Sequence, residues 1–344
     1  MEPKRILVRL TCSKLGDFLM ATPTLAGLRD RYPNASITAL ITPPDPGEWL
    51  TQHPFLEAVL WDDRKGTTGG PIGALKMAAL LRKGNYDAAI DLRDRARYAW
   101  LFRFAGIPIR IGSTTRYYGP LLTRNVAQDR DRPDRHEIEY NFDLARQIGV
   151  TGAPERMWLP ISERAEEEAR GLLRSAGATS HLPLILVNAS HGGTSRSWPA
   201  ERFAAVSQAL AKTGGQIALI GGRESMETNR LIAQSLGRNT VDLTALTSVP
   251  VLAAVLKKSA LHISIDTGTM HLAAAMETPC VALFPFQEHW EQRVRWQPWK
   301  TAFRAIGPTV RCPGCRPGKC VRKHNDCVDS ITVEEVLTAA RELL

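Results

Sequence analysis

The stretch "SIDTGTMHLAAAMETP", residues 264–279, decides the fold class of this chain. It lies between two apolar runs, 261–263 and 280–284. Short apolar runs bounded by turn residues predict buried strands, and the alanine-rich segment between them predicts a helix. The polar residues Asp266, Thr267 and Gly268 fall at the corner from strand to helix. Open α/β folds bind their ligands at such corners, so this stretch predicts both a fold class and a candidate site.

The same alternation of strand and helix extends along most of the sequence. In the first half we expect strands at 6–10, 36–41, 58–61, 87–91 and 110–111, with helices at 18–31, 72–83, 95–105 and 136–148. In the second half we expect strands at 184–188, 216–220, 240–243, 261–265 and 280–284, with helices at 200–213, 224–237, 249–258 and 269–277. Pro154 and Pro160 mark a linker between the halves. The pattern predicts two parallel-sheet α/β domains that face each other across a cleft.

Composition describes a globular protein with an acidic partner. The 344 residues are 44% hydrophobic and 23% charged, which suffices for two cores. No apolar run is long enough to span a membrane, and Arg9 comes too early for a signal-peptide core, so we expect a cytoplasmic protein. The net charge of +9 favours a nucleic acid, an anionic membrane face or a phosphorylated substrate.

The corner at Asp266 allows two interpretations. Asp266 or Thr267 could simply cap the helix. Alternatively, the helix N-terminus binds a phosphate, and His271 in its first turn contacts the phosphate or the sugar. Aspartic proteases also carry the letters "DTG", but they pair two carboxylates on β-rich lobes, which this α/β pattern excludes.

Two further corners of the second half could bind a nucleotide. The segment 188–203 offers hydroxyls and a cation for a pyrophosphate at Thr194, Ser195 and Arg196, or else it is a loop before a helix. Glu224 could accept hydrogen bonds from ribose hydroxyls, or could simply favour a helix N-terminus. The chain has neither a G-x-G-x-x-G fingerprint nor a Walker sequence, which argues against a nicotinamide or flavin enzyme.

Asp17 is the candidate catalytic residue of the first half. It follows the first predicted strand at the start of a helix, where an aspartate is a good cap. The same position would place its carboxylate at the carboxyl end of the strand, beside the crevice. There it could act as a general base toward a substrate hydroxyl.

Four motifs together resemble glycosyltransferase family 9, the ADP-heptose:lipopolysaccharide heptosyltransferases. They are "LGDFLMATPTLAGLRDRYP", "YDAAIDLRDRARYAWLFRFAGIPIRIG", "RSWPAERF" and "SIDTGTMHLAAAMETPCVALF". The resemblance implies the GT-B fold, with a Rossmann-like acceptor-binding domain at 1–157 and a Rossmann-like nucleotide-sugar-binding domain at 158–330. A last helix within 331–344 is expected to pack back on the N-terminal domain.

The resemblance also implies roles for residues. Asp17 would be the catalytic base, although the longer segment between Arg9 and Gly16 could re-aim it. The remaining positions would bind the donor: Thr194, Ser195, Arg196, Glu224, Asp266, Thr267, Gly268, Thr269 and His271. The implied reaction is an inverting transfer of heptose from ADP-heptose to a hydroxyl of an anionic glycolipid. It needs no metal or other cofactor for catalysis and would occur at the inner face of the cytoplasmic membrane.

The segment 312–327 concentrates Cys312, Cys315, Cys320 and Cys327. In a cytosolic protein such a cluster favours a metal over disulfides, so we predict a structural zinc or iron site. Reduced thiols in a connector are the alternative.

Three other functions stay open on the sequence alone. The chain could be a GT-B enzyme that uses another nucleotide sugar or a protein acceptor of the autotransporter kind. It could bind nucleic acid through its basic charge, although no recognition motif stands out, so no nucleic-acid partner is expected. It could also be a scaffold without catalytic activity.

Overall fold

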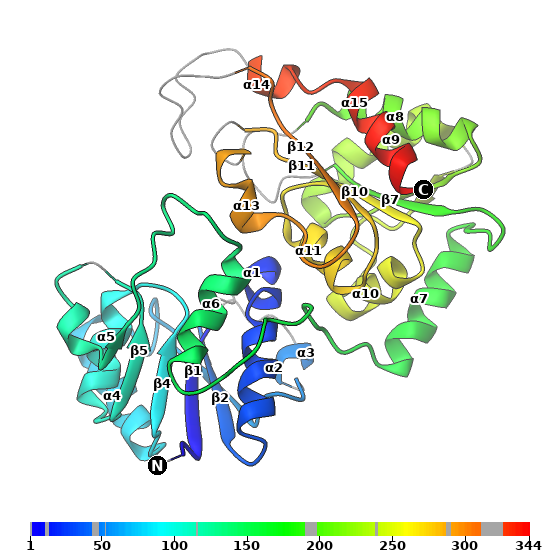
Figure 1. Ribbon diagram of the computed structural model, residues 1–344. Helices are drawn as coiled ribbons and strands as arrows, with labels where there is room; N and C mark the ends of the chain where they lie inside the picture. Colours follow the sequence, from blue (N-terminus) through cyan, green and yellow to red (C-terminus); the bar gives the residue numbers. More distant parts are fainter. Residues whose placement is uncertain are drawn as a thin grey trace. The chain divides into compact units, whose positions relative to one another are not determined.

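The computed structural model describes residues 2–10, 14–42, 48–51, 53–114, 116–189, 198–237, 240–286, 290–310 and 326–344, as drawn in Figure 1. The chain divides into two compact units, Met1–Trp158 and Leu159–Leu344. Among the described residues, no helix combines the length and the apolar character needed to cross a bilayer.

The first unit is a six-stranded parallel sheet with helices on both faces. Its strands are β1 (Arg5–Arg9), β2 (Ser36–Ile41), β3 (Ala58–Trp61), β4 (Ala88–Asp91), β5 (Ile109–Gly112) and β6 (Arg124–Asn125). Its helices are α1 (Leu15–Leu19), α2 (Thr22–Arg31), α3 (Glu48–Thr51), α4 (Gly70–Lys83), α5 (Ala96–Phe104) and α6 (Glu137–Arg146), with a 3₁₀ turn at Gly119–Leu121. Helix α4 packs beside α5, and α2 packs beside α6.

The second unit repeats this plan. Its strands are β7 (Leu184–Asn188), β8 (Gln216–Leu219), β9 (Thr240–Asp242), β10 (Leu261–Ile265), β11 (Cys280–Leu283) and β12 (Phe303–Ile306). Its helices are α7 (Glu163–Ser175), α8 (Ala200–Lys212), α9 (Met226–Leu236), α10 (Val249–Lys257), α11 (Gly268–Ala275), α13 (Arg293–Trp296), α14 (Asp326–Asp329) and α15 (Val333–Leu343), with a 3₁₀ turn at Arg223–Ser225.

Both sheets have the doubly wound strand order of a Rossmann fold. The order is β3-β2-β1-β4-β5-β6 in the first unit and β12-β11-β10-β7-β8-β9 in the second. In each sheet the first three strands are added from the centre toward one edge, and the next three from the centre toward the other edge. The topological switch points therefore lie between β1 and β4 and between β7 and β10. The predicted class of two parallel α/β sheets is therefore confirmed.

The central strands form because most of their residues are apolar, which suits strands whose two faces are both covered by helices. In β1, residues Ile6, Leu7 and Val8 are fully buried, and β10 is buried along its whole length. The sequence prediction missed β6 and β12, at one edge of each sheet. β6 consists of two exposed polar residues and β12 carries the exposed Arg304, so neither shows an apolar run.

The C-terminal helix corrects one expectation. Instead of packing back on the N-terminal domain, α15 packs on α8 and on β10, β11 and β12 of the second unit. Its buried side chains, such as Val336 and Ala340, belong to the core of that unit. The segment before it is held there as well, because the Trp198 indole donates to the Ile331 carbonyl at 3.1 Å. The apolar face of this helix is thus used by the second sheet.

Candidate functional site

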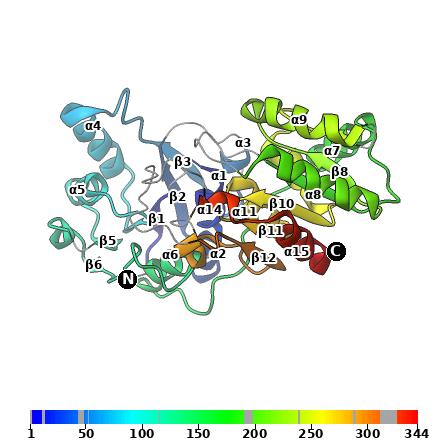
Figure 2. The same ribbon diagram turned by 90° about the horizontal axis from the view of Figure 1, so that it is seen from above.

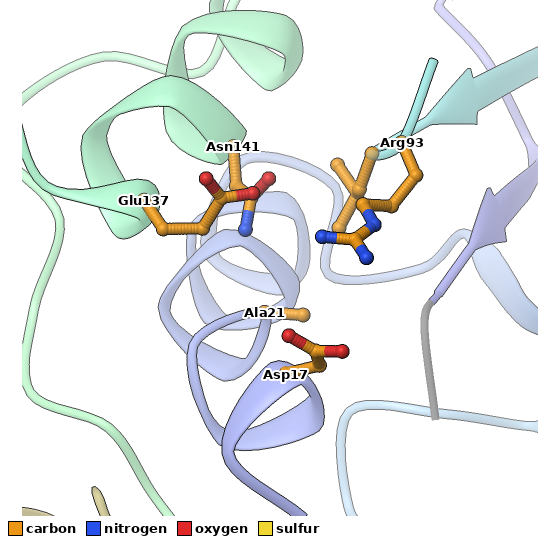
Figure 3. Close-up of a pocket in the computed structure, with 6 residues that line it drawn as sticks. Asp17, Ala21, Arg93, Glu137 and Asn141 are labelled. Atoms are coloured by element: carbon orange, nitrogen blue, oxygen red, sulfur yellow. The ribbon is translucent and has the colours of Figure 1, made fainter. Parts of the chain in front are cut away.

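A small pocket lies at the switch point of the first unit, and Asp17 lines it. The pocket is also lined by Ala21, between α1 and α2, and by Leu92 and Arg93, which follow β4. Glu137 and Asn141 line it from α6. Figure 3 shows the Asp17 carboxylate and the Arg93 guanidinium directed into this pocket, with Glu137 and Asn141 facing it from α6. The candidate base therefore shares a pocket with a cation, at the carboxyl edge of the sheet.

The local sequence explains how Asp17 reaches this position. Lys14 has an extended backbone and begins the short helix α1, so Asp17 is in its first turn, where a carboxylate suits the helix dipole. The following residue, Phe18, is fully buried and packs edge-on against the rings of Trp49 and His53, at 4.7 and 5.5 Å between centroids. Burial of Phe18 fixes α1 and keeps the Asp17 side chain at the pocket.

Arg130 joins the far wall of the pocket to the loop after β4. Its guanidinium donates to the Glu137 carboxylate at 2.5 Å and to the Leu92 carbonyl at 3.0 Å. Arg130 also donates to the Asn141 side-chain oxygen at 3.4 Å, while the Asn141 amide donates to the Met20 carbonyl at 3.5 Å. These bonds connect α6, the β4 loop and the junction of α1 and α2, so the walls of the pocket are held together.

A buried ion pair crosses the same switch point. Arg9 ends β1, Asp91 ends β4, and the two residues are register partners with a side-chain separation of 3.4 Å. Burial raises the pKa of Asp91, and the positive charge of Arg9 opposes that rise. The Arg9 guanidinium also lies over the Tyr98 ring, 4.3 Å from its centroid. Asp91 accepts the backbone N–H of Arg93 at 3.0 Å, which connects the ion pair to the pocket.

A second buried carboxylate, Asp62, follows β3 at the same edge. It accepts two hydrogen bonds from Arg97, at 2.8 and 2.9 Å, and one each from Tyr98 and Thr68, at 2.9 and 2.7 Å. Burial would raise the pKa of Asp62, but the bonds from Arg97, Thr68 and Tyr98 lower it below its usual value. Burial raises the pKa of the Tyr98 hydroxyl to about 12, so Tyr98 remains a donor.

The switch point of the second unit carries a cluster of neutral polar groups next to Asp266, the carboxylate that follows β10. The Asn188 amide, at the end of β7, donates to the Thr269 hydroxyl at 2.8 Å and to the Thr267 hydroxyl at 3.5 Å. The two hydroxyls lie 3.1 Å apart, and the His262 Nε2 lies 3.2 Å from the Thr269 hydroxyl. Burial lowers the pKa of His262 to about 4, so this imidazole is neutral at physiological pH.

The hydrogen bonds of Thr267 test one part of the capping interpretation of the Asp266 corner. Thr267 precedes α11 with φ −145° and ψ 172°, yet its side chain makes no capping hydrogen bond. Its hydroxyl is instead hydrogen-bonded to the Thr269 hydroxyl and accepts from the Asn188 amide. Of the two capping candidates, Asp266 and Thr267, the side chain of Thr267 therefore does not cap the helix. Its hydroxyl belongs to a polar cluster at the start of α11.

The structure brings most of the predicted donor residues to this edge. Asp266, Thr267, Gly268 and Thr269 are partly exposed between β10 and α11, while His271 is buried in the first turn of α11. Glu224 is exposed in the 3₁₀ turn after β8, where its carboxylate accepts the Gly222 N–H at 3.2 Å. That bond supports the plainer interpretation of Glu224, in which it stabilises its own turn.

Some of the predicted residues cannot be placed. Thr194, Ser195 and Arg196, and likewise Cys312, Cys315 and Cys320, lie outside the described residues. Cys327 is described, and it is buried on α14 in the core of the second unit. Among the residues that the structure describes, no group of His, Cys, Asp or Glu could hold a metal ion. The zinc or iron site stays a prediction.

Sequence reasoning missed Arg93, Glu137 and Asn141 of the pocket, and the ion pair Arg9–Asp91. The letters "DLRDRAR" after the β4 run could have indicated the loop, since Asp91 and Arg93 come directly after an apolar strand. Glu137 and Asn141 gave no such signal, because they lie on a helix far away in the sequence.

Two Rossmann-like sheets with polar switch points define the architecture of GT-B glycosyltransferases, and comparison with known proteins supports this class. A crystal structure of the glycosyl transferase family 9 from Veillonella parvula covers 100% of this chain and 98% of its own, with a TM-score of 0.85 and 24% identity. The structure of Escherichia coli ADP-heptose lps heptosyltransferase II covers 98% of each chain, with a TM-score of 0.74 and 22% identity. These likenesses establish the fold.

The sequence comparison then identifies the family. The model of glycosyltransferase family 9 (heptosyltransferase) matches residues 74–325, so the chain belongs to that family. It is also 27% identical over 291 residues to lipopolysaccharide heptosyltransferase 3 of Escherichia coli K12. This alignment covers 83% of this chain and 82% of the relative. The protein is a glycosyltransferase, and the resemblance inferred from its four motifs is confirmed.

Proposed function

We propose that this protein transfers a heptose from ADP-heptose to a hydroxyl of a lipopolysaccharide inner-core acceptor, with inversion at the anomeric carbon. The observation that carries the proposal is the Asp17 carboxylate, which lines a pocket at a Rossmann switch point in a chain of the heptosyltransferase family. Most of the similar proteins whose names specify an activity are heptosyltransferases, and the names of their structures include ADP-heptose or an analogue of it.

In the proposed reaction Asp17 is the general base. The acceptor hydroxyl attacks the anomeric carbon, a new C–O bond forms there, and the bond from that carbon to the ADP phosphate oxygen breaks. The hydroxyl proton passes to the Asp17 carboxylate, and ADP leaves with the bonding electron pair. A general base of this kind contributes about 10²–10⁴-fold to the rate. Arg93, which is directed into the same pocket, would attract an anionic acceptor.

The donor would bind at the β10–α11 corner of the second unit. The backbone N–H groups at the start of α11 would donate to the diphosphate, and the helix dipole adds to that attraction. Asp266 and the hydroxyls of Thr267 and Thr269 would contact the sugar or the phosphates. Thr194, Ser195, Arg196, Glu224 and His271 remain proposed donor contacts on the strength of the family resemblance. Because these groups would stabilise the departing ADP, catalysis needs no divalent metal in this proposal.

The acceptor determines where the enzyme works. An inner-core lipopolysaccharide precursor is an anionic glycolipid, so the protein would act at the inner face of the cytoplasmic membrane as a peripheral protein. The net charge of +9 suits both the acceptor and an anionic membrane surface.

The test is a transfer assay without added metal. Purified protein is incubated with a heptose-deficient core lipid and, separately, ADP-heptose, a UDP-sugar and a GDP-sugar, and the acceptor is weighed by mass spectrometry. Addition of one heptose and release of ADP from ADP-heptose alone support the proposal. Transfer from a UDP-sugar or GDP-sugar would overturn the donor assignment. Transfer to a protein and not to the lipid would overturn the acceptor assignment.

A further inference from the structure

The outer face of α4 and α5 exposes large apolar side chains. Ile72 is 71% exposed and Leu75 64% exposed, and Leu80, Trp100 and Phe104 are between 41% and 51% exposed. We call these five residues the α4–α5 face.

The fold does not need these side chains. The opposite side of α4 already supplies Met77, Ala78 and Leu81 to the core, and Tyr98 and Phe102 do the same for α5. A surface helix ordinarily turns polar residues to solvent. Large exposed apolar patches mark sites of interaction with a partner or a membrane.

The two helices form one surface. Figures 1 and 2 show α4 and α5 side by side from both directions, and the helices pack on each other. The Arg82 guanidinium donates to the Phe104 carbonyl at 2.5 Å, which joins the C-terminal turn of α4 to the C-terminal end of α5. The rings of Trp100 and Phe104 stack at 5.5 Å with 22° between their planes, so they present a single aromatic surface.

All charged residues on these helices are basic. The sequences GPIGALKMAALLRK of α4 and ARYAWLFRF of α5 contain lysine and arginine but no aspartate or glutamate. Lys76, Arg82, Lys83 and Arg103 are exposed among the apolar side chains. Basic residues that surround aliphatic side chains and a tryptophan are typical of helices that lie in the interface of an anionic bilayer.

We propose that the α4–α5 face docks the first unit on an anionic phospholipid bilayer. The apolar side chains enter the boundary between headgroups and acyl chains, while the four cations contact lipid phosphates. Both helices begin at the carboxyl edge of the sheet, since α4 follows the loop after Asp62 and α5 follows the loop after Asp91. Docking here keeps the edge that carries Asp17 near a lipid-borne acceptor. This last step rests on the proposed function, whereas the binding itself does not.

A flotation experiment tests the docking surface without any sugar substrate. The full chain is floated with vesicles of phosphatidylethanolamine and phosphatidylglycerol, and with vesicles of phosphatidylcholine alone. We expect binding to the anionic vesicles that weakens with salt, and much less binding to the neutral ones. The variants Leu75→Glu and Trp100→Glu should each reduce the bound fraction about tenfold or more. The new carboxylate is repelled by the lipid phosphates, and the apolar side chain that would enter the bilayer is lost.

The matched control is Leu231→Glu on α9, which alters a leucine of 44% exposure in the second unit and should leave flotation unchanged. The double variant Lys76→Gln/Lys83→Gln removes two cations of this surface. It should float less with anionic vesicles, while its low flotation with neutral vesicles should stay unchanged. Circular dichroism and ADP titration check that each variant is folded. Equal flotation of Leu75→Glu and the wild type would overturn the proposal. The proposal would also be overturned if the wild-type protein did not float with anionic vesicles. A wild-type dimer in sedimentation that Leu75→Glu converts to a monomer would overturn it as well.

The test separates this proposal from the proposed function. If flotation depends on the face but heptose transfer fails, the docking surface stands and the assigned activity falls. If transfer proceeds on the glycolipid in vesicles and is equal for Leu75→Glu and wild type, the activity stands and the docking surface falls.

Discussion

The two switch points share one topology and differ in their chemistry. In the first unit, charged groups meet where β1 and β4 end: Arg9 forms a buried pair with Asp91, and Asp17, Arg93 and Glu137 line the pocket. In the second unit, the end of β7 and the β10–α11 corner bring together an amide and two hydroxyls, which the neutral imidazole of His262 in β10 also contacts, and Asp266 is the carboxylate of this corner. The same 3-2-1-4-5-6 strand order thus supports a site with a buried ion pair and a site whose hydrogen-bonded cluster is neutral.

The difference corresponds to two tasks in a transfer reaction. A proton acceptor needs a carboxylate whose position and ionisation are held by neighbouring groups. A diphosphate needs hydrogen-bond donors and a helix N-terminus, and a carboxylate cluster there would repel it. This difference supports the proposed division, in which the first unit removes the proton and the second binds the donor.

The largest effect is expected from the charged site. Asp17→Asn keeps the shape of the side chain and removes the base, so the heptose transfer rate should fall by about 10²–10⁴-fold. Single-turnover kinetics measure it. The matched control is Asp30→Asn, an exposed carboxylate on α2, which should transfer at the wild-type rate. Undiminished turnover in Asp17→Asn would remove Asp17 from the base role.

The next effect is on the stability of the first unit. Arg9→Met leaves the buried Asp91 without its cation, which should lower the free energy of unfolding by about 3–5 kcal/mol. Urea denaturation measures the loss. In Arg31→Met, which breaks the exposed pair with Glu2, the loss should be under about 1 kcal/mol. The double variant Arg9→Met/Asp91→Asn should recover part of the stability; an Arg9→Met loss equal to that of Arg31→Met would contradict the account.

Acid should weaken both units through one buried histidine in each. Burial lowers the pKa of His53 and of His262 from 6.5 to about 4. Between these pH values the unfolded chain binds more protons than the native one, so the free energy of unfolding falls as the pH drops. The loss from pH 7 to pH 5 should be about 2 kcal/mol per histidine. Urea denaturation of His262→Gln at both pH values should show a shallower dependence; an unchanged slope would argue against a neutral His262.

The smallest effect concerns the neutral site. Thr269→Val removes the hydroxyl that accepts from Asn188 and lies against His262. ADP affinity should fall about tenfold, because the cluster loses its centre and buried polar groups lose a partner. Thr269→Ser keeps the hydroxyl and should bind ADP within about twofold of the wild type. Calorimetric titration compares the two variants, and equal weakening in both would show that the methyl group matters instead.

The sequence was sufficient for the class of fold and for the position of both switch points. Buried runs that are mainly apolar, such as 184–187 in β7, mark central strands because these strands are covered on both faces. The edge strands β6 and β12 escaped prediction because they are short and partly exposed. The expectation for the C-terminal helix came from the family resemblance, and the residues of the helix itself do not specify the sheet on which it packs.

For the site, a residue directly after an apolar run could be predicted and a residue from a distant helix could not. Asp17, Asp266 and Thr269 follow strands, and local sequence indicates them. Glu137 and Asn141 reach the pocket only because α6 packs beside α2. The lateral bonding of Thr267 depends on Asn188 from another strand, so a motif could not distinguish it from a helix cap.

The division of tasks between the two units is tested most directly by calorimetric titration of ADP into Asp17→Asn and Asp266→Ala, without added divalent metal. The account predicts that Asp17→Asn binds ADP as tightly as the wild type, while Asp266→Ala binds it more weakly. Loss of ADP affinity in Asp17→Asn with wild-type affinity in Asp266→Ala would contradict it.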